Sequence, residues 1–203
     1  MADFDLVIRN ARIVDGTGTP WYRGDAGVRD GVIAAVGTLP PGVPCAEEID
    51  AGGEVLAPGF IDMHTHNDFL LLGDGAGVSK LRQGVTTILV GQCGISAAPI
   101  RDERVSLLDA YTGFIRAGVT PEWNWRSFAE YLDVLDGLDL GLNVGSFVGH
   151  GTIRLNVLGF ENRLPSPDEL REMREMARAA LEEGAFGMTS GLIYPPGVYS
   201  ASG

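Results

Sequence analysis

Two of the three histidines of this chain stand in one short segment, G-F-I-D-M-H-T-H-N-D, from Gly59 to Asp68. Asp62, His64 and His66 occupy every second position after an apolar run, so their side chains share one face if a strand continues through them. Each two-residue step spans about 6.6 Å, which lets two imidazoles converge on one ion at the end of a strand. His64 and His66 are therefore candidate metal ligands. The alternative is a pair of exposed loop histidines.

Two carboxylates flank this histidine pair. Asp62 lies on the same face as the imidazoles, where it can accept the second N–H of a ligand ring and fix its tautomer. Asp68 follows the pair closely, and we expect it to support the ligands as well. The sequence thus predicts a metal site with carboxylates placed behind its ligands.

A cysteine closes the next apolar run, in the segment G-Q-C-G-I-S around Cys93. Neighbouring strands lie about 4.8 Å apart, so a thiol that ends the second strand can approach an ion held by histidines of the first. A zinc-bound cysteine is a thiolate and a good ligand for that metal. A buried, inert thiol is the alternative for Cys93, and it is the interpretation we give to Cys45.

Two further segments carry polar side chains just past strand-like runs. His150 ends the third run, in S-F-V-G-H-G-T-I-R, four residues before Arg154. His150 is a candidate ligand or active-site residue, and it could equally bond to the loop that follows. Tyr194 stands before a rigid Pro-Pro turn, where its hydroxyl can donate to a substrate oxygen or simply pack as a loop aromatic.

The elements that position these residues fall into two parts. Residues 1–56 read as short strands, with the hairpin signal Asp30-Gly31 between two of them, and form a small β-module that we expect to be a β-sandwich. From Val55 on, apolar runs alternate with helical patterns, which is typical of successive βα units in a parallel sheet. The α/β region 57–203 is therefore predicted as the first four βα units of a metal-dependent (β/α)8 TIM-like barrel, a fold that needs about 250 residues. We expect the chain to be a fragment.

Four runs are the predicted strands of this second part, at 55–62, 85–92, 140–149 and 185–190. Helices are expected between them near 78–83, 104–115 and 127–135, followed by a long helix before the last strand. That long helix opens with Ser166-Pro167-Asp168-Glu169, where serine caps, proline takes the first turn and Glu169 completes a capping box. Its apolar stripe predicts packing against the sheet, through Leu170, Met173, Met176, Ala177, Ala180 and Leu181.

Composition restricts the class of protein. The formal net charge of -12 repels phosphate groups, and the 15 basic residues form no run, which argues against nucleic acid or an anionic membrane as partner. The sequence shows no signal peptide and no apolar run of bilayer length, and its two cysteines suggest no disulfide framework. A cytoplasmic protein is expected, and the oligomeric state stays open.

Four motifs together resemble a known family. G-F-I-D-x-H-x-H after a β-module resembles the amidohydrolase superfamily of metal hydrolases. V-G-Q-C-G-I-S-A-A-P, V-G-H-G-T-I-R and G-A-F-G-M-T-S-G-L-I-Y-P-P-G are similar to segments of the N-acyl-D-amino-acid deacylases, the D-aminoacylases. The resemblance runs across nearly all 203 residues. It implies one or two zinc ions and hydrolysis of a small-molecule N-acyl-D-amino acid to a carboxylate and a D-amino acid.

The resemblance also implies residue roles. His64, His66 and Cys93 match metal ligands of the family, and Tyr194 matches a tyrosine near the scissile carbonyl. Many superfamily members bridge their metals with a carboxylated lysine on the fourth strand. This chain has no lysine in 185–190, and its single lysine, Lys80, lies in a predicted helix, so the residues favour the thiolate.

Other parts of the family's site have no match in these residues. They are two later histidines, a catalytic aspartate and most groups that bind the substrate carboxylate, for which Arg154 is the one candidate here. The alternatives are a cyclic amidase or dipeptidase of the same superfamily, or a truncated chain without activity.

Overall fold

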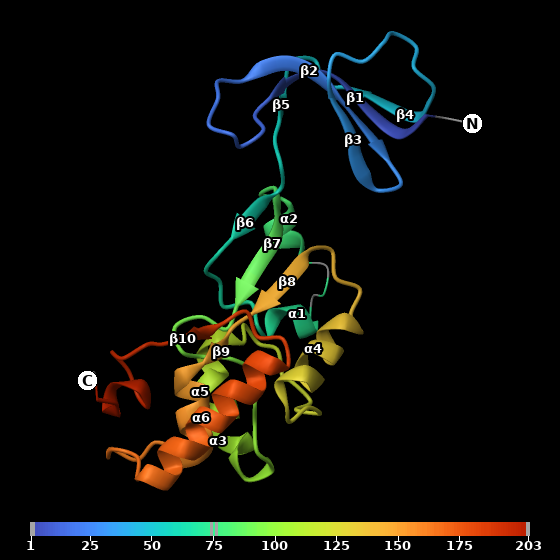
Figure 1. Cartoon of the computed structure of the whole chain (residues 1–203). Helices are drawn as coiled ribbons and strands as arrows, with labels where there is room; N and C mark the ends of the chain where they lie inside the picture. Colours follow the sequence, from blue (N-terminus) through green and yellow to red (C-terminus); the bar gives the residue numbers. More distant parts are fainter. Residues whose placement is uncertain (1–2, 74, 76, 202–203) are drawn as a thin grey trace. The chain divides into compact units, whose positions relative to one another are not determined.

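The computed structural model describes residues 3–73, 75 and 77–201 of the chain. It contains two compact units, Met1–Gly59 and Phe60–Gly203. The strands of the first unit and the strands and helices of the second are labelled in Figure 1. The first unit has one sheet and the second has two, and each unit is described by itself.

The first unit is a five-stranded sheet in the order β3-β2-β1-β4, with β5 also paired to β1. Strands β1, β2 and β3 are antiparallel neighbours, whereas β4 and β5 run parallel to β1. The strand bounds are β1 Phe4–Ile13, β2 Tyr22–Arg29, β3 Val32–Gly37, β4 Cys45–Asp50 and β5 Val55–Leu56.

The turn between β2 and β3 confirms the predicted hairpin. Asp30 and Gly31 both have positive φ angles, 52° and 73°. Two consecutive positive φ angles make the type of two-residue turn whose twist matches that of paired strands. Aspartate and glycine are the residue types that adopt this conformation at low cost, which is why the sequence revealed it.

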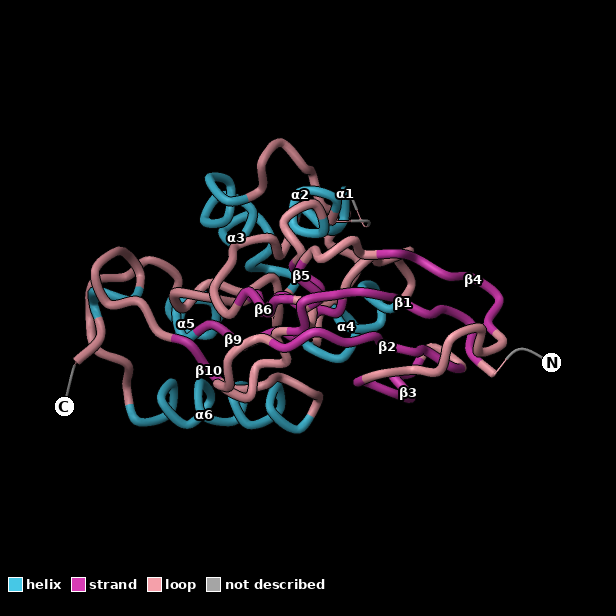
Figure 2. The backbone as a smooth tube through the Cα atoms, turned by 90° about the horizontal axis from the view of Figure 1, so that it is seen from above, coloured by secondary structure: helices cyan, strands magenta, loops and turns pink. Residues whose placement is uncertain are grey.

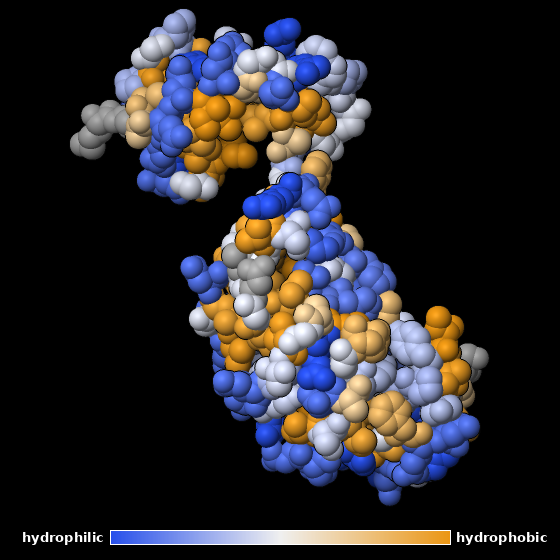
Figure 3. Space-filling view, turned by 180° about the vertical axis from the view of Figure 1, so that it is seen from behind, coloured by the Kyte–Doolittle hydropathy of each residue, from blue (hydrophilic) through white to orange (hydrophobic). Residues whose placement is uncertain are grey.

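The described strands of the first unit form one sheet, and a second layer of a sandwich is not formed among them. Val32, Ile33 and Val36 of β3 are all exposed. Figure 3 shows apolar atoms gathered on a face of this unit. The sheet therefore leaves apolar surface in contact with solvent, the kind of surface that another layer ordinarily covers.

The second unit contains parallel strands in chain order. Strands β6, β7 and β8 pair in sequence, and β9 pairs with β10. Their bounds are β6 Phe60–Asp62, β7 Val85–Val90, β8 Asn143–Ser146, β9 Val148–Gly149 and β10 Met188–Thr189. All four predicted runs contain strand, but the first is interrupted between Leu56 and Phe60 and the third at Phe147. The second unit is thus a mixed α/β structure with parallel strand neighbours.

Helices connect these strands. Their bounds are α1 Leu70–Gly73, α2 Val78–Leu81, α3 Val105–Thr112, α4 Phe128–Asp136, α5 His150–Leu158 and α6 Pro167–Glu182, with 3-10 turns at Asp102–Arg104, Gly113–Ile115 and Gly197–Tyr199. Helix α5 packs against both α3 and α6, and Figure 2 shows α3 and α6 on opposite sides of β9. No helix among residues 3–73, 75 and 77–201 is long and apolar enough to cross a bilayer.

The start of α6 confirms the predicted capping box. The hydroxyl of Ser166 accepts the amide of Glu169 at 3.2 Å, and the Glu169 carboxylate accepts the amide of Ser166 at 2.7 Å. The predicted apolar stripe is only partly correct. Met173 and Ala180 are buried, but Leu170 and Leu181 are exposed. The apolar stripe of α6 therefore extends beyond the part of the helix that packs against the rest of the unit.

Aromatic side chains dominate the core of the second unit. Trp125, Tyr131, Phe69 and Phe128 are fully buried. Trp125 packs against Trp123 and Tyr131 with ring centroids 5.4 and 5.5 Å apart, and its indole N–H donates to the Ala97 carbonyl at 2.9 Å. This core lies beside the ends of β7 and β9 and gives the loops that follow them a rigid support.

Candidate metal centre

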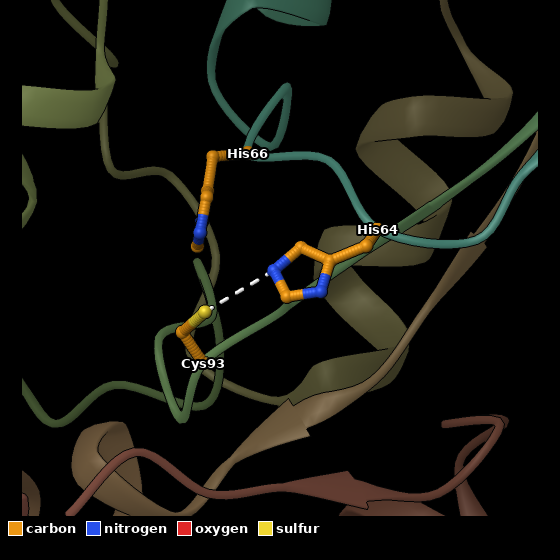
Figure 4. Close-up of side chains that lie close together, drawn as sticks. All are labelled: His64, His66 and Cys93. Carbon is orange, nitrogen blue, oxygen red and sulfur yellow. Dashed lines mark hydrogen bonds between the residues drawn. The ribbon is translucent and has the colours of Figure 1, made fainter.

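Three donor side chains meet where two parallel strands end. The Nε2 atom of His64 lies 3.2 Å from the Sγ atom of Cys93, and the rings of His64 and His66 meet edge-on with centroids 5.7 Å apart. One ligand atom from each of the three residues lies within 4.8 Å of the others. Figure 4 shows His66 and His64 pointing toward Cys93 from one segment. The structure thus brings the three predicted ligands together.

The histidine segment is irregular and is not a strand. Strand β6 ends at Asp62, where the predicted strand 55–62 also ends, and His64 and His66 follow it. Their convergence depends instead on the conformation of the segment that leads into α1. The amide of Thr65 donates to the Leu89 carbonyl at 3.4 Å, which ties this segment to the neighbouring strand β7.

An unusual backbone holds Cys93. Its φ angle is 57°, a left-handed value that a residue with a side chain rarely adopts, and Gly91 and Gly94 on either side also have positive φ. A Cβ atom at Gly91 would collide with the carbonyl oxygen of Phe147, and one at Gly94 would come within 2.8 Å of the Gly191 amide nitrogen. The two glycines therefore allow close packing that turns the Cys93 thiol toward the histidines.

Asp62 supports the centre through the backbone. Its carboxylate accepts the His64 amide at 3.1 Å and the Lys80 ammonium at 2.6 Å. The hydrogen bond from Lys80, followed by that from the His64 amide, lowers the pKa of Asp62 despite the opposing effect of burial. Asp62 contacts the backbone of His64 here and not an imidazole N–H, so its predicted bond to a ligand ring stays a prediction.

Asp68 links the two ligand-bearing segments. It is fully buried, and its Oδ1 atom accepts the Gly91 amide at 2.8 Å while its Oδ2 atom has no partner among the described residues. Burial raises the pKa of Asp68 to about 7, although amide hydrogen bonds oppose that shift. The aspartate fastens the turn after His66 to the end of β7, two residues before Cys93.

The donor set fits a zinc ion. The Nδ1 atom of His66 is buried and has no hydrogen-bond partner within the described chain. Burial, followed by the charge of His64, lowers the pKa of His66 and so favours the neutral imidazole that binds metals. Zinc prefers tetrahedral nitrogen and sulfur ligands at about 2.0–2.3 Å. The separations in this cluster are within reach of small side-chain rotations.

Tyr194 lies beside the cluster. Its hydroxyl donates to the carbonyl oxygen of Cys93, and the ring borders the same cavity as His66 and Cys93. Burial, followed by the proximity of Cys93, raises the pKa of the Tyr194 phenol to about 12. The phenol therefore stays protonated at neutral pH and remains a hydrogen-bond donor at the edge of the centre.

His150 and Arg154 lie outside the three-residue cluster. His150 begins α5 instead of ending a strand, and its Nδ1 atom is 3.5 Å from the Ser190 hydroxyl. Arg154 is fully buried and donates to the carbonyls of Glu161 and Arg163 at 3.0 and 2.6 Å. Both residues line a separate cavity of about 290 Å³.

Three aromatic residues that the sequence did not indicate line the cavity beside His66 and Cys93. They are Tyr111, Phe114 and Phe160, and they belong to no recognisable motif.

The sequence model of the amidohydrolase family matches residues 47–198. The chain belongs to the amidohydrolase family. It is 38% identical over 197 residues to the D-aminoacylase of Alcaligenes xylosoxydans xylosoxydans, which covers 95% of this chain and 39% of that protein. The resemblance to the D-aminoacylases that the four motifs indicated is therefore confirmed.

Two solved structures match in three dimensions. A D-aminoacylase with a binuclear metal centre superposes with a TM-score of 0.86 at 36% identity, over 98% of this chain and 40% of that one. N-acyl-D-glutamate deacylase from Bordetella bronchiseptica, complexed with zinc and a phosphonate mimic of the tetrahedral intermediate, gives a TM-score of 0.84 at 38% identity over the same shares. The chain thus spans about two fifths of the length of these relatives.

Proposed function

We propose that the protein carrying this chain hydrolyses the amide bond of N-acyl-D-amino acids. The observation that carries the proposal is the meeting of His64, His66 and Cys93, with Nε2 of His64 3.2 Å from Sγ of Cys93. The same activity is named for relatives that are 36–39% identical over almost all of this chain. The reaction adds water across the amide, which leaves a carboxylate and a free D-amino acid.

The three side chains would hold one or two zinc ions. Bound zinc lowers the pKa of a coordinated water to about 7 and polarises a carbonyl oxygen. Asp62 and Asp68 keep the ligand-bearing segments in place through their bonds to the amides of His64 and Gly91. Relatives with zinc or a binuclear centre support this assignment.

Tyr194 is the candidate catalytic residue of this chain. Its hydroxyl donates to the Cys93 carbonyl at the edge of the centre. A rotation of the phenol would let the same O–H donate to the oxygen of a substrate carbonyl, where negative charge develops as water attacks. His150 and Arg154 stay proposals for substrate contact, because they line the neighbouring cavity.

We also infer the larger architecture. Residues 57–203 would form the first four βα units of a TIM-like barrel, since the strands β6, β7, β8 with β9, and β10 are parallel neighbours in chain order. Residues 1–56 would form one layer of a β-sandwich, and the exposed apolar side chains of β3 support a covering layer. A cytoplasmic location stays a prediction from the sequence.

The test uses the longest natural chain that contains these 203 residues, purified with and without zinc. We expect hydrolysis of N-acetyl-D-amino acids that depends on zinc and exceeds that of the L-enantiomers. Hydrolysis of dihydropyrimidines or dipeptides in place of acylated D-amino acids would instead support the cyclic amidase or dipeptidase alternative. The 203-residue chain assayed alone for zinc content and turnover tests whether it is inert.

A further inference from the structure

A tight turn carries the Cys93 thiol. The amide of Ile95 donates to the Gln92 carbonyl at 2.9 Å and closes this turn. The two residues between them, Cys93 and Gly94, have φ angles of 57° and 76°. A turn whose two central residues both have positive φ favours glycine, asparagine and aspartate. A cysteine at the first central position is therefore strained, and the surrounding structure has to hold it there.

A threonine of β10 bonds to this turn on both sides of the cysteine. The Thr189 hydroxyl donates to the Gly91 carbonyl at 2.5 Å and accepts the Gly94 amide at 3.0 Å. A hydroxyl has one donor and two acceptor positions, so a single side chain makes both bonds at once. Strand β10 thus fixes the backbone before and after Cys93.

The peptide unit that follows Cys93 is held at both of its polar atoms. Its carbonyl oxygen accepts the Tyr194 hydroxyl, and its N–H, which belongs to Gly94, donates to Thr189. Turning this peptide unit over would break both hydrogen bonds and change the direction of the thiol. When the Tyr194 hydroxyl turns toward a substrate carbonyl, as proposed above, the two bonds of Thr189 remain. Thr189 is thus the group that keeps the orientation of the turn while Tyr194 acts.

Close backbone packing brings Thr189 to the turn. Thr189 is the parallel partner of Gly149 in β9. A Cβ atom on Gly149 would lie 2.5 Å from the Gly94 carbonyl oxygen, so the backbone of β9 touches the cysteine turn directly. Strand β10 lies next to β9, within reach of a short side chain. Because threonine is branched at Cβ, its hydroxyl has few directions to choose from.

We propose that Thr189 is a positioning residue of the metal centre, whose hydroxyl holds the Cys93 turn in the conformation that directs the thiolate toward the two histidines. The proposal rests on the metal centre proposed above and adds a residue that acts through Cys93. Partners behind metal ligands are typically worth about 10–100-fold in metal affinity. The alternative is that Thr189 stabilises the fold as a whole and has no specific effect on the centre.

Two substitutions of Thr189 separate its hydroxyl from its shape. Thr189→Val removes the hydroxyl and keeps the branched side chain, whereas Thr189→Ser keeps the hydroxyl. Thr112→Val is the matched control, because Thr112 is a buried threonine of α3 whose hydroxyl donates to the Leu108 carbonyl at 2.8 Å. All variants are made in the longest natural chain that contains these 203 residues.

Two measurements report on the metal ligands. One is the dissociation constant of zinc, by competition with a chelator, and the other is the thiolate-to-metal charge-transfer absorption after cobalt replaces zinc. Thr189→Val should weaken zinc binding about tenfold or more and alter the cobalt–thiolate absorption. Thr189→Ser and Thr112→Val should retain the wild-type affinity and absorption, even where urea unfolding shows a loss of stability. Wild-type values in Thr189→Val, or equal losses in Thr189→Ser, would overturn the proposal.

A double-mutant cycle tests whether Thr189 acts through the sulfur. In a chain that already carries Cys93→Ser, Thr189→Val should cost little further zinc affinity, because the ligand that it positions is gone. Additive losses would mean that Thr189 acts on the fold as a whole, and would overturn the positioning role. If Thr189→Val does not fold, Thr189→Ala and Thr189→Ser form a second pair that differs by one hydroxyl, and the same comparison is made with them.

The single variant Cys93→Ser separates this proposal from the proposed function. Wild-type zinc affinity in Cys93→Ser removes the proposed metal centre, and the role of Thr189 is lost with it. Weakened zinc binding in Cys93→Ser together with wild-type binding in Thr189→Val keeps the centre and overturns the positioning role alone.

Discussion

The Nε2 atom of His64 lies 3.2 Å from the Sγ atom of Cys93, although 29 positions separate the two residues in sequence. Strands β6 and β7 are parallel neighbours, so the segments that follow them leave the same edge of the sheet. The two histidines come from an irregular segment after β6, and the cysteine is a residue with a left-handed backbone that lies between Gly91 and Gly94. Two irregular segments, each fixed by the sheet behind it, thus form one cluster.

The cluster predicts the effect of removing its sulfur. Cys93→Ser should lower the zinc affinity of the 203-residue chain more than tenfold, because loss of an outer-shell partner alone typically costs 10–100-fold. Zinc per chain and the dissociation constant are measured by competition with a chelator. Cys45→Ser is the control, since Cys45 lies in β4 of the other unit. Unchanged zinc affinity in Cys93→Ser would contradict the assignment of this residue.

Two substitutions of Asp68, to alanine and to asparagine, should differ in their effect on the stability of the chain. Asp68→Ala leaves the buried amide of Gly91 without its acceptor, which costs about 1–3 kcal/mol. Asp68→Asn retains a carbonyl oxygen at that position and should recover most of the loss. Urea unfolding of both variants measures the difference. Equal stability of the two would show that the hydrogen bond to Gly91 contributes nothing.

The Asp25 carboxylate should make a pH-dependent contribution to the free energy of unfolding of the first unit. Burial alone would raise its pKa, but hydrogen bonds from the amides of Asn10 and Leu39 and from Arg9 lower it below 3.8. A carboxylate whose folded pKa is depressed stabilises the fold above its unfolded pKa, and the contribution disappears as pH falls through the folded value. Asp25→Asn should therefore cost about 2 kcal/mol at pH 7, as expected for hydrogen bonds to a charged group.

The check for Asp25 is denaturant unfolding of wild type and Asp25→Asn between pH 7 and pH 2. The difference in the free energy of unfolding should narrow below pH 4. A difference that stays constant down to pH 2 would rule out the carboxylate charge as its source.

The N-cap hydroxyl of Ser166 should stabilise α6. Ser166→Ala removes the acceptor of the Glu169 amide and should reduce the free energy of unfolding by about 1 kcal/mol. Ser106→Ala in α3 is a suitable comparison, because Ser106 is an exposed helical serine and should change stability little. Thermal unfolding followed by circular dichroism compares the two. A loss in Ser106→Ala as large as that in Ser166→Ala would contradict the capping explanation.

Removal of the Tyr194 hydroxyl should lower kcat. In the longest natural chain, Tyr194→Phe removes the O–H that we place near the substrate carbonyl, and kcat should fall about 10²-fold, as for loss of one oxyanion donor. KM and zinc content should change little, because Tyr194 is not among the three proposed ligands. A fall in zinc content equal to the fall in kcat would mean that the phenol acts through its bond to the Cys93 carbonyl.

Sequence reasoning succeeded where local chemistry dictates structure. Asp30-Gly31 and Ser166 specify their turn and cap by themselves. The meeting of His64, His66 and Cys93 was predictable because each follows the end of a neighbouring parallel strand, β6 or β7. The family resemblance independently matched the same three residues to metal ligands.

Other features depend on contacts that no local pattern records. His150 begins a helix because the chain packs its first turn against the Gly94 loop, where the Thr152 amide donates to the Gly94 carbonyl at 3.2 Å. The sequence also did not show that Arg154 is fully buried, with its guanidinium bonded to the backbone carbonyls of Glu161 and Arg163. Tyr111 packs edge-on against Phe160 because α3 packs on α5, and no local sequence pattern predicts that contact.

The single lysine of the chain donates to Asp62, so the third metal ligand that we propose is the sulfur of Cys93 and not a carboxylated lysine. A carbamate forms from dissolved carbon dioxide, whereas a thiolate is attacked by peroxide and passes to sulfenic and then sulfinic acid. Metal uptake at this centre should therefore respond to oxidants and reductants in the medium and be indifferent to bicarbonate.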